Sequence, residues 1–443
     1  MAAGRGHFGS RLGFVLAAAG SAVGIGNIWK FPYMTGQNGG AAFLVLYLAL
    51  TFTIGLSVML AEFAIGSAAQ RNPVGAFARL KGGLWPVVGA LGLLAGFVIL
   101  SFYGVVAGWT IAYVVKALTG ALSSNDPEQL GGIFGEFISS PIEPVAYQAL
   151  FMALTVGVVL GGVHDGIERW CKVLMPALFI LLLVLIVRSL TLPGAEEGIA
   201  FYLKPDFSLV TAETFNGALA QAFFSLSLGM GAMITYGSYV RKEENLATSA
   251  IWVTGLDATV AILAGLLIMP AVFAFGFNPA EGPGLSFVTL PAVFSSMPFG
   301  EVFAALFFLL LSIAALTSAV SLLEVVVAYF VDERGFGRKK AATLFGFLIF
   351  LVGVPSSLSL GVWSDFTIAG KGFLDLMDFV ATNLLLPLGG FFIALFVGWV
   401  IYPRAIEEVT NRGEIAFPAA RLWGFVLRFV APIAIAWILI SGL

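Results

Sequence analysis

The chain has 443 residues, of which 59% are hydrophobic and only 11% charged, and its mean hydropathy is +1.00. Because soluble domains carry roughly a quarter charged residues, this composition excludes a soluble globular protein. One cysteine, two histidines outside the apolar segments and a net charge of −3 without a basic domain exclude a disulfide framework, a Cys- or His-based metal centre and a nucleic-acid-binding protein.

Eleven apolar segments follow one another along the chain, and each is long enough to cross a bilayer as a helix. They cover residues 11–35, 41–69, 87–119, 146–162, 170–192, 214–240, 247–276, 300–331, 341–361, 374–402 and 420–441. The first also resembles the apolar region of a signal peptide, but ten segments follow it and its glycine pattern recurs later, so we expect it to remain as a span. No low-complexity linker divides the chain, which predicts one transmembrane domain over residues 1–443.

Lysine and arginine predict the orientation of the spans, because they concentrate in cytoplasmic loops. With the N-terminus inside, 16 of the 22 basic residues fall on the cytoplasmic side, five fall outside, and Arg428 lies within the last span. This split predicts a cytoplasmic N-terminus, and eleven spans then place the C-terminus outside.

Two segments contain paired glycines where a helix should continue. Gly24 and Gly26 lie within the first segment and Gly229 and Gly231 within the sixth, each pair beside small polar residues. Glycine costs about 1 kcal/mol relative to alanine inside a helix. For one segment alone close helix packing is the better explanation, since Gly20 and Gly24 also form a GxxxG pair. The same pattern in both segments instead indicates unwound points in corresponding halves of an inverted repeat.

An unwound stretch in the middle of a bilayer predicts a binding site. Its backbone N–H and C=O groups would each cost several kcal/mol if they were left unpaired in hydrocarbon. Free carbonyls suit a hard cation such as sodium, and helix N-termini suit a carboxylate. A cation and the carboxylate of an amino acid could therefore lie side by side and neutralise each other, which is a physical basis for coupled transport.

Three acidic residues, Glu62, Asp257 and Glu324, lie deep within the spans. Ionisable groups in such positions are expensive and commonly functional. This favours a role in binding for Asp257. For Glu62 and Glu324, a helix-capping or protonated carboxyl inside the bundle is an equally good explanation.

Long motifs of the chain resemble the neurotransmitter:sodium symporter family over nearly its whole length. They are Arg11-Leu-Gly, Gly24-Ile-Gly-Asn-Ile-Trp-Lys-Phe-Pro, Asn38-Gly-Gly-Ala-Ala-Phe, Gln221-Ala-Phe-Phe-Ser-Leu-Ser-Leu-Gly-Met-Gly and Ala314-Ala-Leu-Thr-Ser. Among bacterial members, the chain is most similar to the multi-hydrophobic-amino-acid and tyrosine transporters, which implies a bacterial inner (plasma) membrane.

This resemblance implies an all-α integral membrane protein of the leucine-transporter fold. Eleven transmembrane helices would include a 5+5 inverted repeat, with discontinuous helices 1 and 6. The two repeats would cover about 11–192 and 214–402, and an extra helix would follow at 420–441.

The resemblance also implies two sodium sites. The first would use the Ala22 carbonyl, the side chains of Asn27, Ser225 and Asp257, and the substrate carboxylate. The second would use the carbonyls of Gly20, Val23 and Ala314 and the hydroxyls of Thr317 and Ser318. Such oxygen-only ligands suit a hard cation. From Thr317 and Ser318 alone, hydrogen bonds back to the helix backbone would be the preferred explanation.

The substrate is implied to lie between the broken helices. Its carboxylate would meet the amides of Ile25 and Gly26, the hydroxyl of Tyr103 and the first sodium. The other implied pocket residues are Ser21, Ala22, Ile99, Phe224, Ser225, Ser227, Met230, Ser318, Ser321 and Leu322. An apolar lining with a few hydroxyls favours hydrophobic L-amino acids, aliphatic and aromatic. Met230 can repack around ligands of different size, although by itself it could simply fill the core.

Charges near the site lead to two further expectations. Asp257 stands where animal members carry an asparagine, and Ala261 stands where they carry a chloride-binding serine, so a fixed carboxylate would replace chloride and we expect chloride-independent transport. Lys30 and Asp378 would form an outer gate. Arg5 and Asp332 would form an inner one, with a small bias on the conformational equilibrium.

The predicted function is sodium-coupled symport of hydrophobic L-amino acids by alternating access. A proton-coupled symporter of the same fold, with Asp257 or Glu62 as the proton carrier, and an amino-acid receptor without net transport remain open. An enzyme is disfavoured, because the sequence has no P-loop motif, no Cys- or His-based site and no evident base for a nucleophilic serine. Beyond the lipid bilayer we expect no nucleic acid and no obligatory protein partner.

Overall fold

The computed structural model describes residues 6–280 and 284–441, and its regular structure there is helical apart from one isolated bridge between Ile368 and Lys371. Nine continuous apolar spans lie in these ranges. They are α3–α4 (Ala41–Ala69), α6 (Pro86–Leu118), α8 (Glu143–Leu160), η3–α9 (Val163–Leu190), α13 (Leu246–Ala274), α15 (Gly300–Arg334), α16 (Arg338–Leu358), α17–η7 (Phe373–Val400) and α20–α21 (Ala420–Ser441).

Four of these spans contain wider π-helical turns, three between α-helices and one, η3, at the start of its span. Their parts are α3 (Ala41–Leu50), η2 (Thr51–Gly55) and α4 (Leu56–Ala69); η3 (Val163–Glu168) and α9 (Arg169–Leu190); α17 (Phe373–Phe379), η6 (Val380–Leu385), α18 (Leu386–Leu395) and η7 (Phe396–Val400); and α20 (Ala420–Phe425), η8 (Val426–Val430) and α21 (Ala431–Ser441). Such turns leave hydrogen bonds intact while they shift the face that a helix presents.

Two further segments are broken, as the glycine pattern predicts. The first runs as α1 (Arg11–Ala22), then η1 (Gly26–Lys30) and α2 (Phe31–Gln37), with a bend of 50° between its halves. The sixth runs as α11 (Ala212–Ser225) and α12 (Ala232–Gly237), with residues 226–231 between them. Together with the nine continuous spans, these two segments fit the predicted eleven. The prediction of discontinuous first and sixth helices is therefore confirmed.

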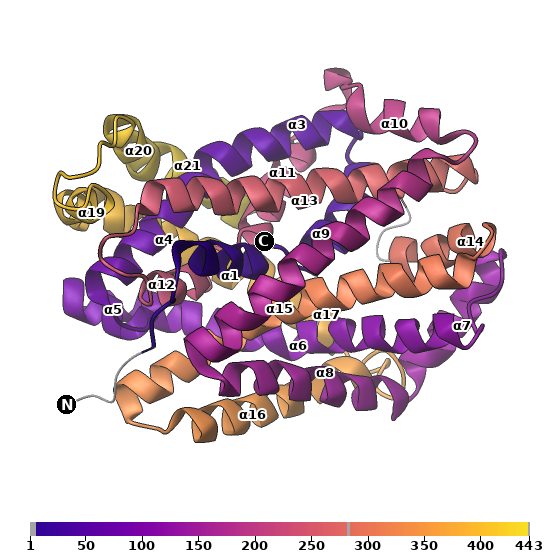
Figure 1. The fold of residues 1–443 in the computed structure, drawn as a ribbon, viewed down its shortest axis with the longest axis horizontal. Coiled ribbons are helices and arrows are strands. Elements are labelled where there is room, and N and C mark those ends of the chain that lie inside the picture. The colour runs from indigo at the N-terminus through magenta and orange to yellow at the C-terminus, as the bar shows by residue number, and fades with distance from the viewer. Residues whose placement is uncertain (1–5, 281–283, 442–443) are drawn as a thin grey trace.

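Short helices cover the two ends of the bundle (Figure 1). At one end lie α5 (Pro73–Leu80) and α19 (Tyr402–Val409), and we call this the α5/α19 end. At the other lie α7 (Pro127–Ser139), α10 (Ala195–Leu203) and α14 (Leu290–Ser295), and we call this the α7/α14 end. The remaining short turns are η4 (Phe207–Leu209) and η5 (Leu285–Thr289).

Local signals in the sequence explain where several helices begin. The Asn72 side chain accepts a hydrogen bond from the Gly75 amide (3.0 Å), and Pro73 follows at the first helical position of α5. Thr211 and Thr214 form a reciprocal capping box at the start of α11. These caps satisfy amides that would otherwise lack a partner at a helix N-terminus.

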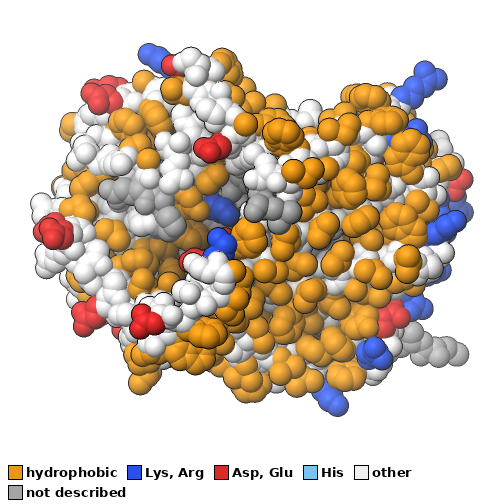
Figure 2. All heavy atoms as spheres, turned by 180° about the vertical axis from the view of Figure 1, so that it is seen from behind, with side chains coloured by type: hydrophobic (Ala, Val, Ile, Leu, Met, Phe, Trp, Pro, Cys, Tyr) orange, Lys and Arg blue, Asp and Glu red, His pale blue; other side chains and the backbone are white. Residues whose placement is uncertain are grey.

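The surface has the polarity of a membrane protein. Hydrophobic side chains cover the middle of the molecule in Figure 2, whereas lysine, arginine, aspartate and glutamate gather toward its ends. Large apolar side chains such as Ile180, Ile251 and Ile433 are more than half exposed. In water such a surface would be unfavourable, but against lipid it costs nothing.

Candidate functional site

The two breaks in the helices lie against each other, and side chains of the sixth segment pair with the backbone of the first. The Ser227 hydroxyl donates to the Ser21 carbonyl (2.9 Å). The Gln221 side-chain amide donates to the Gly26 carbonyl (2.8 Å). Backbone groups near the breaks therefore form a polar region inside an apolar bundle, as the paired glycines predict.

A small cavity lies at these breaks, with a volume of about 20 Å³ open to the centre of a water-sized molecule. It is lined by Ala22, Gly24, Gly26, Ile99, Tyr103, Phe224, Ser225, Ser227, Met230, Ser318 and Leu322. Ten of these eleven residues belong to the predicted substrate pocket, and Gly24 is an addition. Its walls are mainly apolar, with a few hydroxyls, as in sites for small hydrophobic ligands that carry one polar end.

Three predicted pocket residues lie just behind this lining. The Ser21 hydroxyl donates to Ser321 (2.6 Å), so these two serines pair with each other. The Ile25 amide donates to the Tyr103 hydroxyl (3.1 Å), which places that hydroxyl beside the broken first helix. Ile25 itself lines a second, outer cavity.

The predicted ligands of the first sodium site converge on one carboxylate. Asp257, fully buried on α13, accepts hydrogen bonds from the Asn27 amide (2.7 Å) and from the Ser225 hydroxyl (2.8 Å to each oxygen). The Asn27 amide also donates to Ser225 (2.9 Å). Three oxygen-bearing side chains from three segments thus meet beside the cavity.

Tyr47 joins this cluster, and the sequence analysis missed it. Its hydroxyl lies 3.1 Å from an Asp257 oxygen and 3.1 Å from the Ser225 hydroxyl, and the side chain is fully buried on α3. A tyrosine in the middle of an apolar span was the available signal, because a buried phenol needs a polar partner. The carboxylate therefore has hydrogen-bond donors from the first, second and sixth segments.

The residues predicted for the second sodium site come together less completely. A side chain at Gly20 would meet the Cβ of Thr317 at 3.2 Å, and one at Gly24 would meet the Ser318 hydroxyl at 3.2 Å, so α1 and α15 are in close contact there. The Thr317 hydroxyl donates to the carbonyls of Ile313 (3.2 Å) and Ala314 (3.1 Å). This is ordinary back-bonding of a threonine hydroxyl to its own helix. The remaining predicted ligand, the Val23 carbonyl, lies at the break that follows α1.

Glu62 and Glu324 lie outside the cavity lining and have different partners. Glu62 accepts a hydrogen bond from the Gly229 amide (2.7 Å) and so caps the break that precedes α12. Glu324 forms an ion pair with Arg338 and accepts a hydrogen bond from the Tyr239 hydroxyl (2.6 Å). For Glu62 the helix-capping interpretation is the one that the contacts support.

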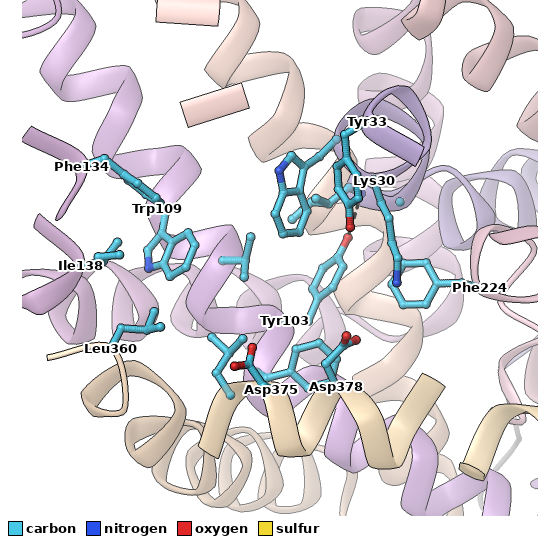
Figure 3. Close-up of a pocket in the computed structure, with 16 residues that line it drawn as sticks. Lys30, Tyr33, Tyr103, Trp109, Phe134, Ile138, Phe224, Leu360, Asp375 and Asp378 are labelled. Carbon is cyan, nitrogen blue, oxygen red and sulfur yellow. Dashed lines mark hydrogen bonds between the residues drawn. The ribbon is translucent and has the colours of Figure 1, made fainter. Parts of the chain in front are cut away.

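The second cavity, which we call the vestibule, adjoins the first and reaches Phe134 and Ile138 of α7 at the α7/α14 end. Figure 3 shows the side chains that line it. Its wall includes Tyr103 and Phe224, which it shares with the cavity, together with the predicted gate residues Lys30 and Asp378. The Lys30 ammonium lies 4.8 Å from the centre of the Phe224 ring. In the described part of the chain no ion pair joins Lys30 to Asp378.

The α5/α19 end, by contrast, is tied together around the start of the first segment. The Phe8 amide donates to the Tyr239 carbonyl (3.1 Å). The buried Glu168 carboxylate accepts from the Gly9 amide (2.6 Å) and pairs with Lys172 (2.6 Å). Polar contacts therefore hold this end of the first segment against α9 and the chain after α12.

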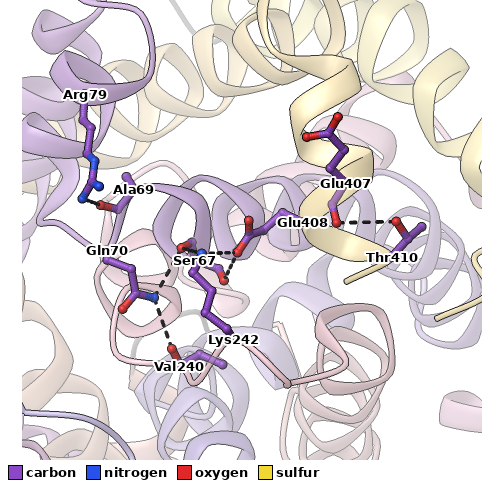
Figure 4. A network of polar contacts seen from close by, with 9 residues as sticks. All are labelled: Ser67, Ala69, Gln70, Arg79, Val240, Lys242, Glu407, Glu408 and Thr410. Carbon is purple, nitrogen blue, oxygen red and sulfur yellow. Dashed lines mark hydrogen bonds and ion pairs between the residues drawn. The ribbon is translucent and has the colours of Figure 1, made fainter. Parts of the chain in front are cut away.

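A second network closes the same end between α4 and α19 (Figure 4). The Lys242 ammonium contacts Glu408 (2.6 Å) and donates to the Ser67 carbonyl (2.7 Å), while the Ser67 hydroxyl donates to Glu408 (2.6 Å).

The predicted inner gate falls partly outside the structure. Arg5 lies outside the described residues, so its predicted pairing with Asp332 stays a prediction. The Asp332 carboxylate accepts hydrogen bonds from the backbone amide (3.0 Å) and the side chain (3.2 Å) of Asn72.

Comparison with known proteins agrees with this arrangement. The sequence profile of the "Sodium:neurotransmitter symporter family" matches residues 5–129 and 143–443. The chain belongs to the sodium:neurotransmitter symporter family. The predicted family resemblance is therefore confirmed, and with it a multi-pass, sodium-coupled transporter of this family.

Individual members of the family match over almost their full lengths. The chain is 44% identical over 431 residues to the "Uncharacterized sodium-dependent transporter YhdH" of Bacillus subtilis, covering 97% of this chain and 96% of that one. It is 40% identical to an "Uncharacterized sodium-dependent transporter" of Haemophilus influenzae, covering 98% and 97%. The crystal structure of MhsT in complex with L-phenylalanine matches with a TM-score of 0.92 and 50% identity, covering 99% of this chain and all of that one. This similarity establishes the leucine-transporter fold.

Proposed function

We propose that this symporter carries hydrophobic L-amino acids, aliphatic and aromatic, into a bacterial cell together with sodium and without chloride. The observation that carries the proposal is the junction of the cavity with the cluster around Asp257. Ser225 belongs to both, because it lines the cavity and donates to the carboxylate. A substrate carboxylate in the cavity and a cation in the cluster would therefore be neighbours.

Sodium is proposed to bind first, at Asn27, Ser225, Asp257 and the Ala22 carbonyl. These side chains now form hydrogen bonds with one another. When sodium binds, their oxygen atoms would contact the ion instead. A second sodium is proposed between the carbonyls of Gly20, Val23 and Ala314 and the hydroxyls of Thr317 and Ser318. Its binding would require the Thr317 hydroxyl to turn away from its own helix.

The cavity walls support the proposed substrate class. The amides of Ile25 and Gly26 and the Tyr103 hydroxyl would hold the substrate carboxylate, while Ile99 and Met230 would contact its side chain. The described residues that line the cavity carry no charged side chain. A charged substrate side chain would lose its hydration in the cavity and find no oppositely charged partner there, which is costly. The crystallised complex of MhsT with L-phenylalanine supports the same class.

Chloride independence is proposed on the charge of Asp257. Its carboxylate is held by Asn27, Ser225 and Tyr47, so a fixed negative charge stands beside the proposed sodium site. One turn along α13, Ala261 has no polar side chain to bind an anion. A second negative charge at this place would meet repulsion rather than stabilisation.

The two ends of the molecule are proposed to act as alternating gates. With the predicted orientation, the vestibule with Lys30 and Asp378 faces outward, and the α5/α19 end faces the cytoplasm with the N-terminus. Substrate and sodium would draw Tyr103 and Phe224 over the cavity. Release inward would require the contacts of Phe8, Tyr239 and Glu168 to separate.

Uptake by proteoliposomes tests the proposal. The full chain is reconstituted, an inward sodium gradient is imposed at fixed pH, and entry of labelled L-phenylalanine is followed with unlabelled amino acids as competitors. We expect uptake that stops when choline replaces sodium and that continues when gluconate replaces chloride. Competition by leucine, tyrosine and tryptophan should exceed competition by lysine or glutamate.

An isosteric variant locates the coupling site. Asp257→Asn should raise the sodium concentration for half-maximal uptake by about tenfold or more, equivalent to about 1.4 kcal/mol. The exposed Asp365→Asn is the matched control and should behave as the wild type. Uptake driven by a proton gradient without sodium, or binding without any uptake, would contradict the proposal and favour a proton-coupled symporter or a receptor.

A further inference from the structure

Arg428 is a charged residue within the membrane that the transport site does not use. It lies in η8, eight residues after the first residue of the last span, which is about 12 Å along a helix. The guanidinium keeps its charge at any physiological pH. A charge at this depth is expensive unless it is paired or reaches the membrane interface.

The partners of Arg428 within the chain are all neutral. Its Nε donates to the Gly398 carbonyl (2.7 Å), and its guanidinium lies over the rings of Tyr402 (4.4 Å) and Trp399 (5.8 Å). Over residues 6–280 and 284–441, no carboxylate forms an ion pair with it, and its terminal amino groups, Nη1 and Nη2, have no hydrogen-bond partner. The positive charge and the donors of both amino groups thus remain for a partner from outside the chain.

An apolar groove lies along the same span as Arg428. It runs between α11 and the last span, and Phe215, Phe425, Phe429, Ile433 and Trp437 line it. The single polar atom on the Trp437 ring already donates to Asn216 (2.8 Å). Nothing in the groove therefore requires water, and its shape suits a hydrocarbon chain.

Trp399 connects the charge to the groove. Its ring contacts Phe429 edge-on, with centroids 5.5 Å apart, and the same ring lies beneath the Arg428 guanidinium. A ligand that filled both places would need an anionic group next to a long apolar chain. Phospholipids combine these features, and their phosphate oxygens match the forked donors of arginine.

We propose that Arg428 and the groove between α11 and the last span form a binding site for an anionic phospholipid. The phosphodiester pairs with Nη1 and Nη2, and one acyl chain lies along Phe425, Phe429 and Ile433. Arg421, about two turns earlier on the same span, adds positive charge toward the α5/α19 end, which favours a headgroup with net negative charge. Because α11 is half of the broken sixth segment, the lipid would contact a segment that forms the transport site.

Thermal unfolding of the purified full-length protein in detergent tests this site. Phosphatidylglycerol is added to the wild type, to Arg428→Gln and to Arg188→Gln. Arg188 is the matched control, because it lies in another span with its guanidinium 5.9 Å from the Phe303 ring. We expect phosphatidylglycerol to raise the Tm of the wild type and of Arg188→Gln by about 2–5 °C, and to leave that of Arg428→Gln unchanged.

Other additives separate the possible sources of the phosphate. Phosphatidylcholine with the same acyl chains should raise the wild-type Tm by less than half as much, and inorganic phosphate should have no effect. An equal rise with inorganic phosphate would show a free-anion site and overturn the lipid proposal. An equal rise with phosphatidylglycerol in the wild type and in Arg428→Gln would overturn it as well.

Two further measurements test the phospholipid site if Arg428→Gln fails to fold. Ile433→Trp fills the groove without touching the charge, and it should abolish the rise caused by phosphatidylglycerol. Native mass spectrometry of the wild type should show one retained phosphatidylglycerol in preference to phosphatidylcholine. A full rise in Ile433→Trp, or retention without headgroup preference, would contradict the proposal.

Discussion

The break in the first segment and the break in the sixth segment interrupt their helices for different physical reasons. At the sixth, the backbone itself leaves helical geometry, since Ser227, Gly229 and Gly231 have φ values of 55°, 78° and 76°. At the first, the backbone leaves helical geometry through the extended Val23 (φ −72°, ψ 100°), and no residue between α1 and η1 has a positive φ. Glycine is needed there because neighbours approach closely: a Cβ on Gly24 would lie 2.9 Å from the Tyr103 hydroxyl, and one on Gly26 would lie 2.9 Å from the Phe224 ring.

This difference indicates which break is rigid. The sixth segment is interrupted by conformations that glycine tolerates and other residues adopt only with strain, and Glu62 caps the break. The first segment is interrupted by an extended conformation at Val23 that any residue can adopt, and Gly24 and Gly26 beside it lie against the proposed substrate-binding residues Tyr103 and Phe224. Binding and release could therefore reshape the first break, while the sixth would serve as the fixed wall of the cavity. Four substitutions test this contrast.

The largest effect is expected from Gly229→Ala. The new Cβ would meet the Leu386 carbonyl at 2.3 Å and the Gly390 amide at 3.0 Å, and the positive φ adds about 1–2 kcal/mol. We expect a fall in Tm of at least about 5 °C and loss of uptake. The matched control is Gly255→Ala on α13, where nothing lies within 4 Å of the added carbon, and this variant should be as stable as the wild type or slightly more stable. An unaltered Tm in Gly229→Ala would refute the rigid sixth break.

Removal of the cap should have the next largest effect. Glu62→Ala leaves the buried Gly229 amide without its acceptor, which costs about 1–3 kcal/mol. Glu62→Gln keeps an oxygen that can accept the same hydrogen bond, so its loss in Tm should be clearly smaller. Thermal unfolding of the two variants measures the difference. Equal losses in Tm would show that the hydrogen bond to the Gly229 amide is not the cause of the destabilisation.

Gly26→Ala should impair binding rather than folding. The added carbon would meet the flexible Phe224 ring and not backbone, and the residue has no positive φ. We expect the KM for L-phenylalanine uptake to rise by about tenfold, equivalent to about 1.4 kcal/mol, with the Tm within about 1 °C of the wild type. A Tm loss as large as that of Gly229→Ala would erase the contrast between the two breaks.

The smallest effect is expected from Ser321→Ala. It removes the partner of the Ser21 hydroxyl behind the cavity, a hydrogen bond worth about 0.5–1.5 kcal/mol. Uptake should fall by less than about tenfold. Thr259→Ala, whose hydroxyl contacts only its own helix on an exposed face, should change neither uptake nor Tm. Complete loss of uptake in Ser321→Ala would mean that this serine contacts substrate or sodium directly.

The helical fold could be predicted from the sequence because its causes are local. Apolar stretches of bilayer length predict spans, and the predicted boundaries of the continuous spans agree with the structure to within a few residues. One exception is the span 170–192, which begins earlier, at Val163, through a π-helical turn around His164 and Glu168. The polar residues of this turn lower its hydropathy, so the sequence pattern did not predict a helix there. In the structure Glu168 forms hydrogen bonds with Gly9 and Ser10 at the start of the first segment, and these take the place of hydrogen bonds to water.

The family motifs named the residues of the site, but only the tertiary structure decided their contacts. Asn27, Ser225 and Asp257 could be proposed as partners from motifs, whereas the place of Tyr47 beside them and the pairing of Glu324 with Arg338 had no sequence signal that specified the partner. Likewise, the glycines of the two broken segments look alike in the sequence. A glycine can be required because its φ is positive or because neighbouring atoms leave no room for a Cβ. Which of the two applies depends on how distant helices pack. Local backbone preference and burial are properties of a segment, but a contact between segments is set by the geometry of the whole bundle.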